Sequence, residues 1–477
     1  MKKQLTNPYL PSWEYVPDGE PHVFGDRVYI YGSHDKFGGT QFCENDYVCW
    51  SAPVNDLSDW RFEGTIYRKE QDPKNRIIKS TMYAPDCCKG PDGRYYLYYG
   101  LNFIPLIGVA VCDTPAGEFR FLGHIRHRNG KLYGRMKTDR FPFDPAVLCE
   151  NGNVYLYSGF SPDKGLLRFG INLMNKVKGA VGNQVLELEN DMVTIKSIKS
   201  LIPGADNSNG TSFEGHEFYE ASSIRKFENK YYFVYSSILS HELCYATSDY
   251  PDKDFVFRGT LHSNGDIGIN GNKSALNYWG NNHGGMEYIN GRYYIFGHRQ
   301  TNCRECNRQG VAELLIMNED GTFMHSEMTS QGLSDKPLGK GRYEAGIACN
   351  LYAKQGAIKS VFFRNKKLCE IHPYITQTGS DRENDPCQYI KNMRDGSVAG
   401  YKYFQCDCKE ISLLIRSDGG VLKISHSPDE KPLCEIKLSF SSDFTQYTAP
   451  LSFDGKKALY FEYNGPGSMD LLSFELK

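Results

Sequence analysis

The sequence lacks the features of a protein that binds polyanions or crosses a membrane. Its 55 Lys and Arg residues are balanced by 57 Asp and Glu residues, so the formal net charge is only -2. Neutralising phosphates or anionic lipids requires a surplus of positive charge, and this balance therefore excludes nucleic-acid and membrane-surface partners. No stretch approaches the roughly 20 apolar residues that a membrane-spanning helix needs. We therefore expect a soluble chain.

An export signal and a disulfide framework are also missing. The N-terminal stretch, MKKQLTNPYLPSWEYVPDG, has two lysines but no apolar run of signal-peptide length. The 15 cysteines are odd in number and have no framework spacing, which suits a reducing compartment. Cys303, Cys306, Cys406 and Cys408 could nominally bind zinc, but the CxC spacing of the second pair and the distance between the pairs favour incidental thiols. We expect a cytoplasmic location.

Tryptophan is scarce, with 4 residues, whereas the 33 Tyr, 27 Phe and 47 Gly residues favour short strands and turns. One phrase occurs five times: a turn, a basic or polar residue, then alternating aromatic and aliphatic positions. The copies are GDRVYIYGS (25–33), DGRYYLYYG (92–100), NGNVYLYSG (151–159), ENKYYFVYSS (228–237) and NGRYYIFGH (290–298). Their DG and NG pairs supply the positive φ of tight turns, so each phrase predicts a hairpin turn that opens a strand.

A second hairpin phrase follows most copies, and the five units lie 67, 59, 77 and 62 residues apart when aligned on Val28, Tyr95, Val154, Tyr231 and Tyr293. Four short strands per unit, repeated five times, predict an all-β fold with a five-bladed β-propeller over residues 1–325. The alternative is a β-sandwich meander with coincidental turns. A polar linker rich in Gly and Pro follows, and residues 338–477 predict a second domain, a jelly-roll-like β-sandwich.

Three carboxylates precede these phrases at similar steps. Asp18 and Asp144 lie seven residues before the turns of the first and third units, and Glu220 lies eight before that of the fourth. The first strand of each blade lines the channel of a propeller, so we expect these side chains to converge. Like charges in one cavity raise at least one pKa, which suits glycoside cleavage by an acid and a base. The alternative is that they cap turns or bind a cation.

The same segments resemble glycoside hydrolase family 43, whose catalytic domain is a five-bladed propeller. PDGEPHVFGD, FDPAV and YEASSIRK are similar to the first, third and fourth blade motifs of that family, and YAPDCCKG to its second, with Tyr83 where Trp is usual. The resemblance implies Asp18 as general base, Glu220 as general acid, Asp144 as the residue that orients the acid and raises its pKa, and Asp86 near the substrate. DGE and EAS depart from the usual DPS and EGP, which affects subsite shape more than chemistry.

Several neighbouring residues are further candidates. Glu217 and Glu214 are rivals of Glu220, although strand alternation places Glu217 on the opposite side. The resemblance implies that His283 coordinates a water-shelled Ca²⁺ on the channel axis. It also implies that Arg299 is a hydrogen-bond donor to sugar hydroxyls, with His298 as the fallback.

Two more substrate contacts rest on position alone. His34 follows the first repeated phrase and could face the sugar, with loop polarity as the equal alternative. Trp13 lies close to Asp18 and could stack on a sugar ring, with packing at the propeller rim as the equal alternative.

The resemblance implies an inverting glycoside hydrolase. An unexported chain should meet imported oligosaccharides rather than polymer, which favours an exo-acting enzyme. We expect it to release terminal α-L-arabinofuranosyl units, and β-D-xylosyl units as a second activity, from hemicellulose-derived oligosaccharides. Within the family the alternatives are a β-xylosidase or an exo-galactosidase, and outside it a non-catalytic sugar-binding propeller. The C-terminal segments RYEAG and KALYFEYNGPGSMDLLSFELK resemble family 6 carbohydrate-binding modules. The sequence leaves the oligomeric state undetermined.

Overall fold

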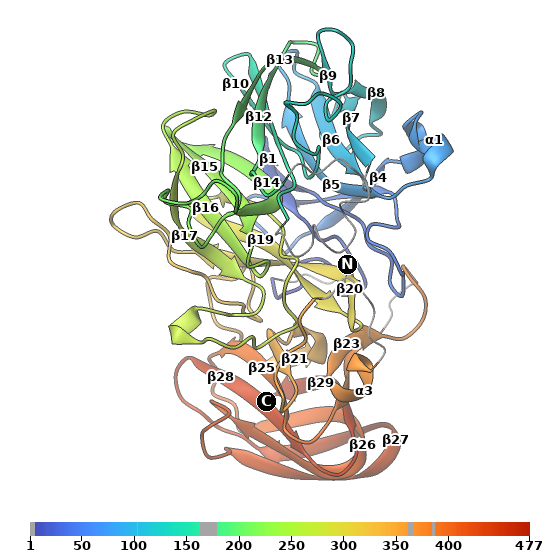
Figure 1. The fold of residues 1–477 in the computed structure, drawn as a ribbon. Coiled ribbons are helices and arrows are strands. Elements are labelled where there is room, and N and C mark those ends of the chain that lie inside the picture. The colour runs from blue at the N-terminus through green and yellow to red at the C-terminus, as the bar shows by residue number, and fades with distance from the viewer. Residues whose placement is uncertain (1–4, 103, 163–178, 361–366, 384–386) are drawn as a thin grey trace.

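The computed structural model describes residues 5–102, 104–162, 179–360, 367–383 and 387–477. The chain forms five small sheets arranged around an axis and then one large sheet that packs below them (Figure 1). All described helices are three or four residues long: Lys69–Gln71, Asn75–Ile78, Ile269–Gly271, Ala345–Ile347 and Leu368–Ile371. The predicted all-β fold, a five-bladed propeller followed by a β-sandwich, is confirmed.

The strands of the first two blades are β1 (Glu20–Phe24), β2 (Arg27–Tyr31), β3 (Tyr47–Pro53), β4 (Arg61–Tyr67), β5 (Met82–Lys89), β6 (Tyr95–Leu101), β7 (Ile104–Cys112) and β8 (Arg120–His124). Blade three contains β9 (Arg126–His127), β10 (Ala146–Glu150), β11 (Asn153–Ser158), β12 (Gln184–Leu188) and β13 (Thr194–Ser200). Blades four and five contain β14 (Phe218–Phe227), β15 (Lys230–Ser237), β16 (Glu242–Ser248), β17 (Val256–Ser263), β18 (Met286–Ile289), β19 (Arg292–Thr301) and β20 (Arg304–Leu315).

The repeated phrase forms the second strand of every blade. Each copy pairs antiparallel with the strand before it, so β1, β5, β10, β14 and β18 are the innermost strands. The turns of the third and fifth copies have positive φ at both central residues, 49° and 79° at Asn151 and Gly152, and 47° and 84° at Asn290 and Gly291. This geometry matches the twist of the flanking strands, which is why NG is the favoured pair.

The first and last blades are joined by the N-terminal segment. The side chain of Asn7 donates to the backbone oxygen of Ala312 (3.1 Å) and accepts from its backbone N–H (2.9 Å). Apolar clusters fill the spaces between neighbouring blades, such as the cluster in which Tyr98 of blade two packs with Leu156 of blade three. The propeller ring is therefore closed by hydrogen bonds and filled by large side chains.

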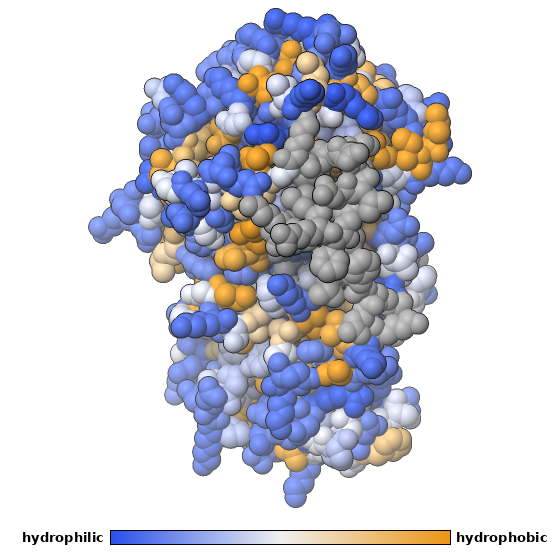
Figure 2. Space-filling model, viewed as in Figure 1, coloured by the Kyte–Doolittle hydropathy of each residue, from blue (hydrophilic) through white to orange (hydrophobic). Residues whose placement is uncertain are grey.

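The second domain is one nine-stranded antiparallel sheet that folds over its own core. Its strands are β21 (Gly341–Glu344), β22 (Asn350–Tyr352), β23 (Tyr374–Gln377), β24 (Gln388–Met393), β25 (Ser397–Phe404), β26 (Glu410–Ser425), β27 (Cys434–Pro450), β28 (Lys457–Asn464) and β29 (Met469–Leu476). Tyr401, Phe461 and Phe474 meet in its centre at ring distances of 4.8 to 5.2 Å. Most side chains on the face of this domain shown in Figure 2 are hydrophilic.

The two domains are joined by buried polar contacts. Lys402 Nζ lies 2.8 Å from Asp266 of the propeller and 3.1 Å from Glu327. The backbone N–H of Asn302 donates to Ile375 in β23 (2.7 Å). Such contacts hold the second domain against the loops of blade five. No helix in the described part of the chain is long and apolar enough to cross a membrane.

Candidate active site

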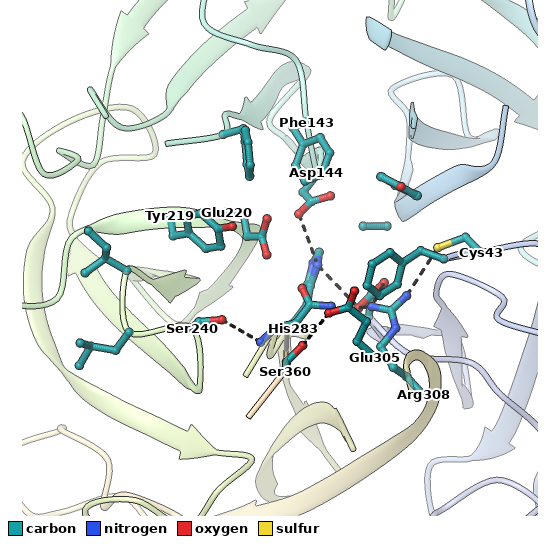
Figure 3. Close-up of a pocket in the computed structure, with 18 of the residues that line it drawn as sticks. Cys43, Phe143, Asp144, Tyr219, Glu220, Ser240, His283, Glu305, Arg308 and Ser360 are labelled. Carbon is teal, nitrogen blue, oxygen red and sulfur yellow. Dashed lines mark hydrogen bonds and ion pairs between the residues drawn. The ribbon is translucent and has the colours of Figure 1, made fainter. Parts of the chain in front are cut away.

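The three predicted carboxylates line one pocket of about 330 Å³, in which Figure 3 labels Asp144 and Glu220. Asp18 precedes β1, Asp144 precedes β10, and Glu220 lies in β14, so three different blades supply them. All three are at least 92% buried. Aromatic and apolar side chains complete the walls: Phe42, Tyr83, Phe143, Phe160, Tyr219, Ile238 and Leu239.

The backbone at these positions is in a rarely occupied conformation. Asp18, Asp144 and Ala221, which follows Glu220, have positive φ angles of 56°, 42° and 64°. For residues with a Cβ the left-handed region costs roughly 1 to 2 kcal/mol, and such strain gathers at functional sites. The start of the innermost strand therefore turns each carboxyl group toward the pocket.

Asp18 is surrounded by cationic and hydrogen-bonding side chains. Arg308 Nη1 donates to both of its carboxylate oxygens (2.8 and 3.0 Å), and His298 Nδ1 lies 3.1 Å from Oδ1. Burial raises the pKa of Asp18, but the Arg308 charge and the two histidines, His298 and His283, outweigh it, so the pKa lies well below its usual value. Asp18 is ionised and is suited to accept a proton.

Glu220 and Asp144 have the opposite environment. Burial and the nearby charge of Asp18 raise the pKa of Glu220 to about 8. Burial, Glu220 and Asp18 together raise the pKa of Asp144 well above its usual value. Asp144 Oδ2 also accepts a hydrogen bond from the backbone N–H of Ala221 (3.2 Å) and so fixes the strand next to Glu220. Glu220 is therefore protonated near neutral pH and is suited to donate a proton.

Arg308, and not Arg299, is the arginine of the pocket. In the β19–β20 hairpin His298 pairs with Gly310 and Arg299 pairs with Gln309. Because side chains alternate along a strand, His298 and Arg308 share one face and Arg299 and Gln309 the other. Arg299 instead donates to Gln309 Oε1 (2.8 Å) and to the backbone oxygen of Ala348 in the second domain (3.1 Å). The prediction for Arg299 was wrong, whereas its fallback His298 lies beside Asp18.

Three other predicted substrate contacts do not line the pocket. Asp86 is fully buried and bonds to His22 Nε2 (2.6 Å) and the backbone N–H of Val147 (2.7 Å). His34 is buried between Glu14 Oε1 (3.1 Å) and the backbone oxygen of Asp46 (2.6 Å). For both His34 and Trp13, the geometry therefore agrees with the alternative prediction, a structural role, and not with contact to the sugar.

Trp13 packs at the boundary of the two domains. Its ring centroid lies 6.1 Å from that of Trp50, and the guanidinium of Arg382 lies 5.5 Å from it.

The two glutamates that were alternatives to Glu220 as the acid do not line the pocket. Glu217 accepts a hydrogen bond from Ser208 Oγ (3.0 Å), and Glu214 accepts one from the Gly210 N–H (3.2 Å).

His283 does line the pocket, and below it lies a group of residues that fits a cation. Its Nδ1 lies 3.6 Å from Asp144 Oδ2 and 3.9 Å from Asp18 Oδ1, and burial lowers its pKa to about 4. Glu20, His22 and Asp86 offer ligand atoms within 4.8 Å of one another. Glu20 Oε1 is buried with no hydrogen-bond partner among the described residues, and burial raises the Glu20 pKa to about 8.

The charges around this group favour a cation as well. Glu20 and Glu287 both contact Arg225, at 3.0 and 3.2 Å, and Asp86 is close enough to raise its pKa. One guanidinium thus faces three buried carboxyl groups. Carboxylate oxygens are the ligands that Ca²⁺ prefers.

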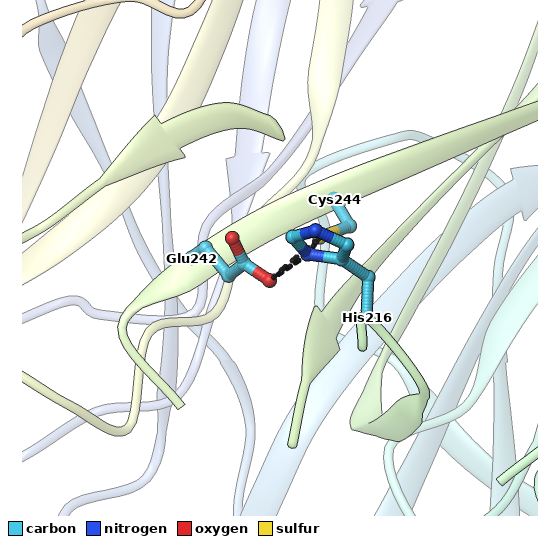
Figure 4. Close-up of side chains that lie close together, drawn as sticks. All are labelled: His216, Glu242 and Cys244. Carbon is cyan, nitrogen blue, oxygen red and sulfur yellow. Dashed lines mark hydrogen bonds and ion pairs between the residues drawn. The ribbon is translucent and has the colours of Figure 1, made fainter. Parts of the chain in front are cut away.

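A second possible metal group lies within blade four, away from the pocket (Figure 4). His216 Nδ1 is 2.7 Å from Glu242 Oε1, and Cys244 Sγ is 3.1 Å from the same oxygen. Ser237 and Thr260 also donate to Glu242, so this carboxylate is already satisfied. The cluster ties the segment before β14 to β16.

The four cysteines considered as zinc ligands, Cys303, Cys306, Cys406 and Cys408, do not form a metal site in the described part of the chain. All 15 cysteines are free, and none of these four belongs to either of the two possible metal groups.

Comparison with known proteins identifies the class. The family model "Glycosyl hydrolases family 43" matches residues 6–323. The chain therefore belongs to glycoside hydrolase family 43 and is a glycoside hydrolase. The matched residues cover the propeller, and the C-terminal β-sandwich lies beyond them.

One relative matches the whole chain and another matches part of it. A protein of Thermoclostridium stercorarium named "Xylosidase/arabinosidase" is 48% identical, covering 100% of this chain and 99% of that protein. One of the same name from Bacteroides ovatus is 30% identical over 61% of this chain and 87% of that protein.

Solved structures share the fold. A family 43 arabinoxylan arabinofuranohydrolase from Bacillus subtilis, solved with cellotetraose, covers 100% of this chain and 99% of its own, with a TM-score of 0.51 and 19% identity. A β-xylosidase/α-arabinofuranosidase from a compost metagenome, solved with xylotriose in a calcium-free form, covers 68% of this chain and 97% of its own, with a TM-score of 0.50 and 24% identity.

Proposed function

We propose that the protein is an inverting, exo-acting glycosidase that releases terminal α-L-arabinofuranosyl residues, and β-D-xylosyl residues as a second activity, from short neutral oligosaccharides. The observation that carries the proposal is the pair of unequal carboxyl groups in one pocket, ionised Asp18 and protonated Glu220. The name of the relative that is 48% identical over the whole chain supports both sugars. The net charge of -2 suits an uncharged substrate.

The mechanism uses Asp18 as base and Glu220 as acid. Asp18 takes a proton from a water molecule while the water oxygen bonds to the anomeric carbon. The bond from that carbon to the leaving oxygen breaks, and Glu220 gives its proton to that oxygen. Asp144 holds the strand that carries Glu220, burial and the charge of Asp18 keep the pKa of Glu220 high, and Arg308 holds Asp18 ionised. An inverting site requires roughly 6.5 to 9.5 Å between base and acid, which leaves room for the water.

A substrate panel tests this function. Purified enzyme is incubated with p-nitrophenyl α-L-arabinofuranoside, β-D-xyloside and β-D-galactoside and with arabino- and xylo-oligosaccharides, and NMR records the anomer that is released first. We expect cleavage of the arabinofuranoside and the xyloside, with single sugars released in the inverted configuration. Products of retained configuration would contradict Asp18 as base, and sugar binding without any cleavage would contradict catalysis.

We also propose that Ca²⁺ binds in the channel below the pocket, where Glu20, His22 and Asp86 would hold it and His283 would contact its water shell. When bound, it would supply fixed positive charge beneath the carboxylates. We expect 1 mM Ca²⁺ to raise the Tm of chelator-treated protein by a few degrees, since a ligand that binds only the folded state stabilises it. Glu20→Gln should remove the shift, while the control Glu217→Gln keeps it. An unchanged Tm in calorimetry would contradict the site.

A cytoplasmic location remains a proposal that the 15 free thiols support. Cell fractionation with an antibody against the protein tests it. Recovery in the culture medium or the periplasm would contradict it.

A further inference from the structure

The mouth of the pocket is built by both domains. Lys359 and Ser360, which follow β22 in the second domain, line the pocket together with Glu305 of β20. Figure 3 shows Ser360 beside Glu305. Lys359 is exposed and the other two are partly exposed, whereas Asp18 and Glu220 are buried. The trio of carboxylates thus lies deep in the pocket, and these three residues lie where it opens to solvent.

The segment of the second domain is held firmly against the propeller. The Trp279 N–H donates to the Ile358 oxygen (3.0 Å), and the Ser360 N–H donates to the Trp279 oxygen (2.7 Å). The ammonium of Lys359 lies 4.7 Å from the ring centroid of Trp279. Gly280, at φ +103°, allows this approach, since a Cβ there would lie 3.0 Å from Ser360 Cβ.

The loop that contains Trp279 also contributes residues to the pocket. Trp279 is followed by Asn281 and His283, both of which line the pocket. The backbone that carries Lys359 and Ser360 is therefore bonded directly to the loop that forms the pocket wall. The mouth has a defined shape before any substrate arrives.

Glu305 is a titratable group of the pocket that the cleavage steps leave unused. Ser360 Oγ donates to its Oε2 (3.1 Å), and burial raises its pKa to about 7. A carboxyl, an ammonium and a hydroxyl group together offer both donors and acceptors. Their opposite charges favour a neutral polyol over an anion or a cation.

We propose that Glu305, Lys359 and Ser360 form a binding subsite for the sugar on the leaving-group side of the scissile bond, so that the second domain helps to select the oligosaccharide. The inference rests on the proposed function, because it assumes that the carboxylate trio holds the terminal sugar. The ligand of the subsite is a neutral pyranose or furanose ring, recognised through its hydroxyl groups.

The test compares two substrates that differ only by the leaving sugar. Methyl β-D-xyloside and xylobiose both lose a poor alkoxide leaving group, but only xylobiose has a second ring; methyl α-L-arabinofuranoside and arabinofuranosyl-xylobiose form the equivalent pair. The readout is the ratio of kcat/KM for the disaccharide or trisaccharide to that for the methyl glycoside. For Lys359→Ala, Ser360→Ala and Glu305→Gln we expect this ratio to fall about 3- to 10-fold, as loss of one or two hydrogen bonds predicts.

Lys354→Ala is the matched control. This lysine lies in the same domain segment, is exposed, pairs with Asp395 and does not line the pocket, so its ratio should equal that of the wild type. Inhibition by the released monosaccharide, which binds at the trio, should be the same in all variants.

The outcomes separate the two proposals. A wild-type enzyme that cleaves neither member of a pair contradicts the proposed function and this subsite with it. A wild-type enzyme that cleaves both, with variants whose ratio is unchanged or whose two substrates slow equally, overturns the subsite alone.

Discussion

At the scale of single residues, the site depends on giving similar carboxyl groups different proton affinities. Asp18 and Glu220 are both buried in one pocket. Arg308 contacts Asp18 directly, whereas Glu220 has mainly burial and the negative charge of Asp18 around it. The first keeps its charge and the second keeps its proton, which is the division of roles that base and acid need.

The first prediction concerns the leaving group. Glu220→Gln should lower kcat on xylobiose about 10²- to 10⁴-fold, the usual contribution of a general acid. It should lower kcat much less on p-nitrophenyl xyloside, because nitrophenolate leaves without protonation. Steady-state kinetics on the two substrates measure the difference. Equal losses would show that Glu220 is not the acid, and Glu217→Gln is the control for a neighbouring carboxyl outside the pocket.

The second prediction concerns pH. A pKa of about 8 for Glu220 means that the acid form disappears as pH rises through 8, so kcat/KM should fall about tenfold per unit above it. Asp18, with its lowered pKa, stays ionised throughout the mildly acidic range. A pH profile from 4 to 10 tests this, and a flat alkaline side would contradict it.

The same shift affects stability with a defined sign. The folded pKa of Glu220 is raised, so folding must take up a proton between about pH 4.5 and 8, and this costs more as pH rises. Glu220→Gln should therefore have a higher Tm than the wild type at pH 8, with the difference vanishing near pH 4.

At the scale of elements, strand alternation decides which neighbouring residue serves the site. Arg299 and Arg308 lie on the two strands of one hairpin and face opposite sides of it. One contacts Asp18 and the other contacts the second domain. Arg308 therefore lies in the pocket beside Asp18, whereas Arg299 stabilises the contact with the second domain.

The third prediction uses this matched pair. Arg308→Met should reduce kcat/KM at least 10²-fold and move the acidic limb of the pH profile upward, because Asp18 loses the cation that keeps it ionised. Arg299→Met should retain the pH profile and lower the free energy of unfolding, because it frees buried Gln309 and a carbonyl oxygen. Kinetics and calorimetry on both variants check this. The same loss of activity in both would contradict the distinction.

The blades and the three carboxylates of the pocket could be predicted from the sequence. The repeated phrase identified the blades, because turn chemistry and period-2 alternation are local properties of the chain. The similar steps to Asp18, Asp144 and Glu220, of seven, seven and eight residues, identified three pocket residues. Arg308 could not be found in this way, because CRECNR draws attention to its cysteines and the register of β19 with β20 determines which face the arginine takes.

At the scale of the whole molecule, the second domain is part of the structure around the pocket. Lys402 and Asp266 form a buried pair across the domain boundary, and Asn350 also donates to Asp266 (2.8 Å). Lys359 and Ser360 reach the pocket mouth. A domain that resembles a sugar-binding module thus also contributes to the catalytic pocket.

The fourth prediction concerns this boundary. Lys402→Met should destabilise the protein by about 3 to 5 kcal/mol, because Asp266 is left buried without its cation. We expect calorimetry to show a lower Tm with the propeller and the sandwich unfolding in separate steps. The double variant Lys402→Met with Asp266→Asn should recover part of the loss. A Tm equal to that of the wild type would contradict a coupling role for this pair.

The sequence by itself determined the propeller, the sandwich, the family and three carboxylates of the pocket. The propeller and the sandwich depend on local periodicity, the carboxylates on spacing within one strand and its turn, and the family on short motifs within single blades. Tertiary structure alone decided which arginine holds Asp18, why His34, Trp13 and Asp86 lie outside the pocket, and that the second domain forms part of its mouth. These features depend on strand register and on contacts between residues hundreds of positions apart, and no local pattern encodes either of them.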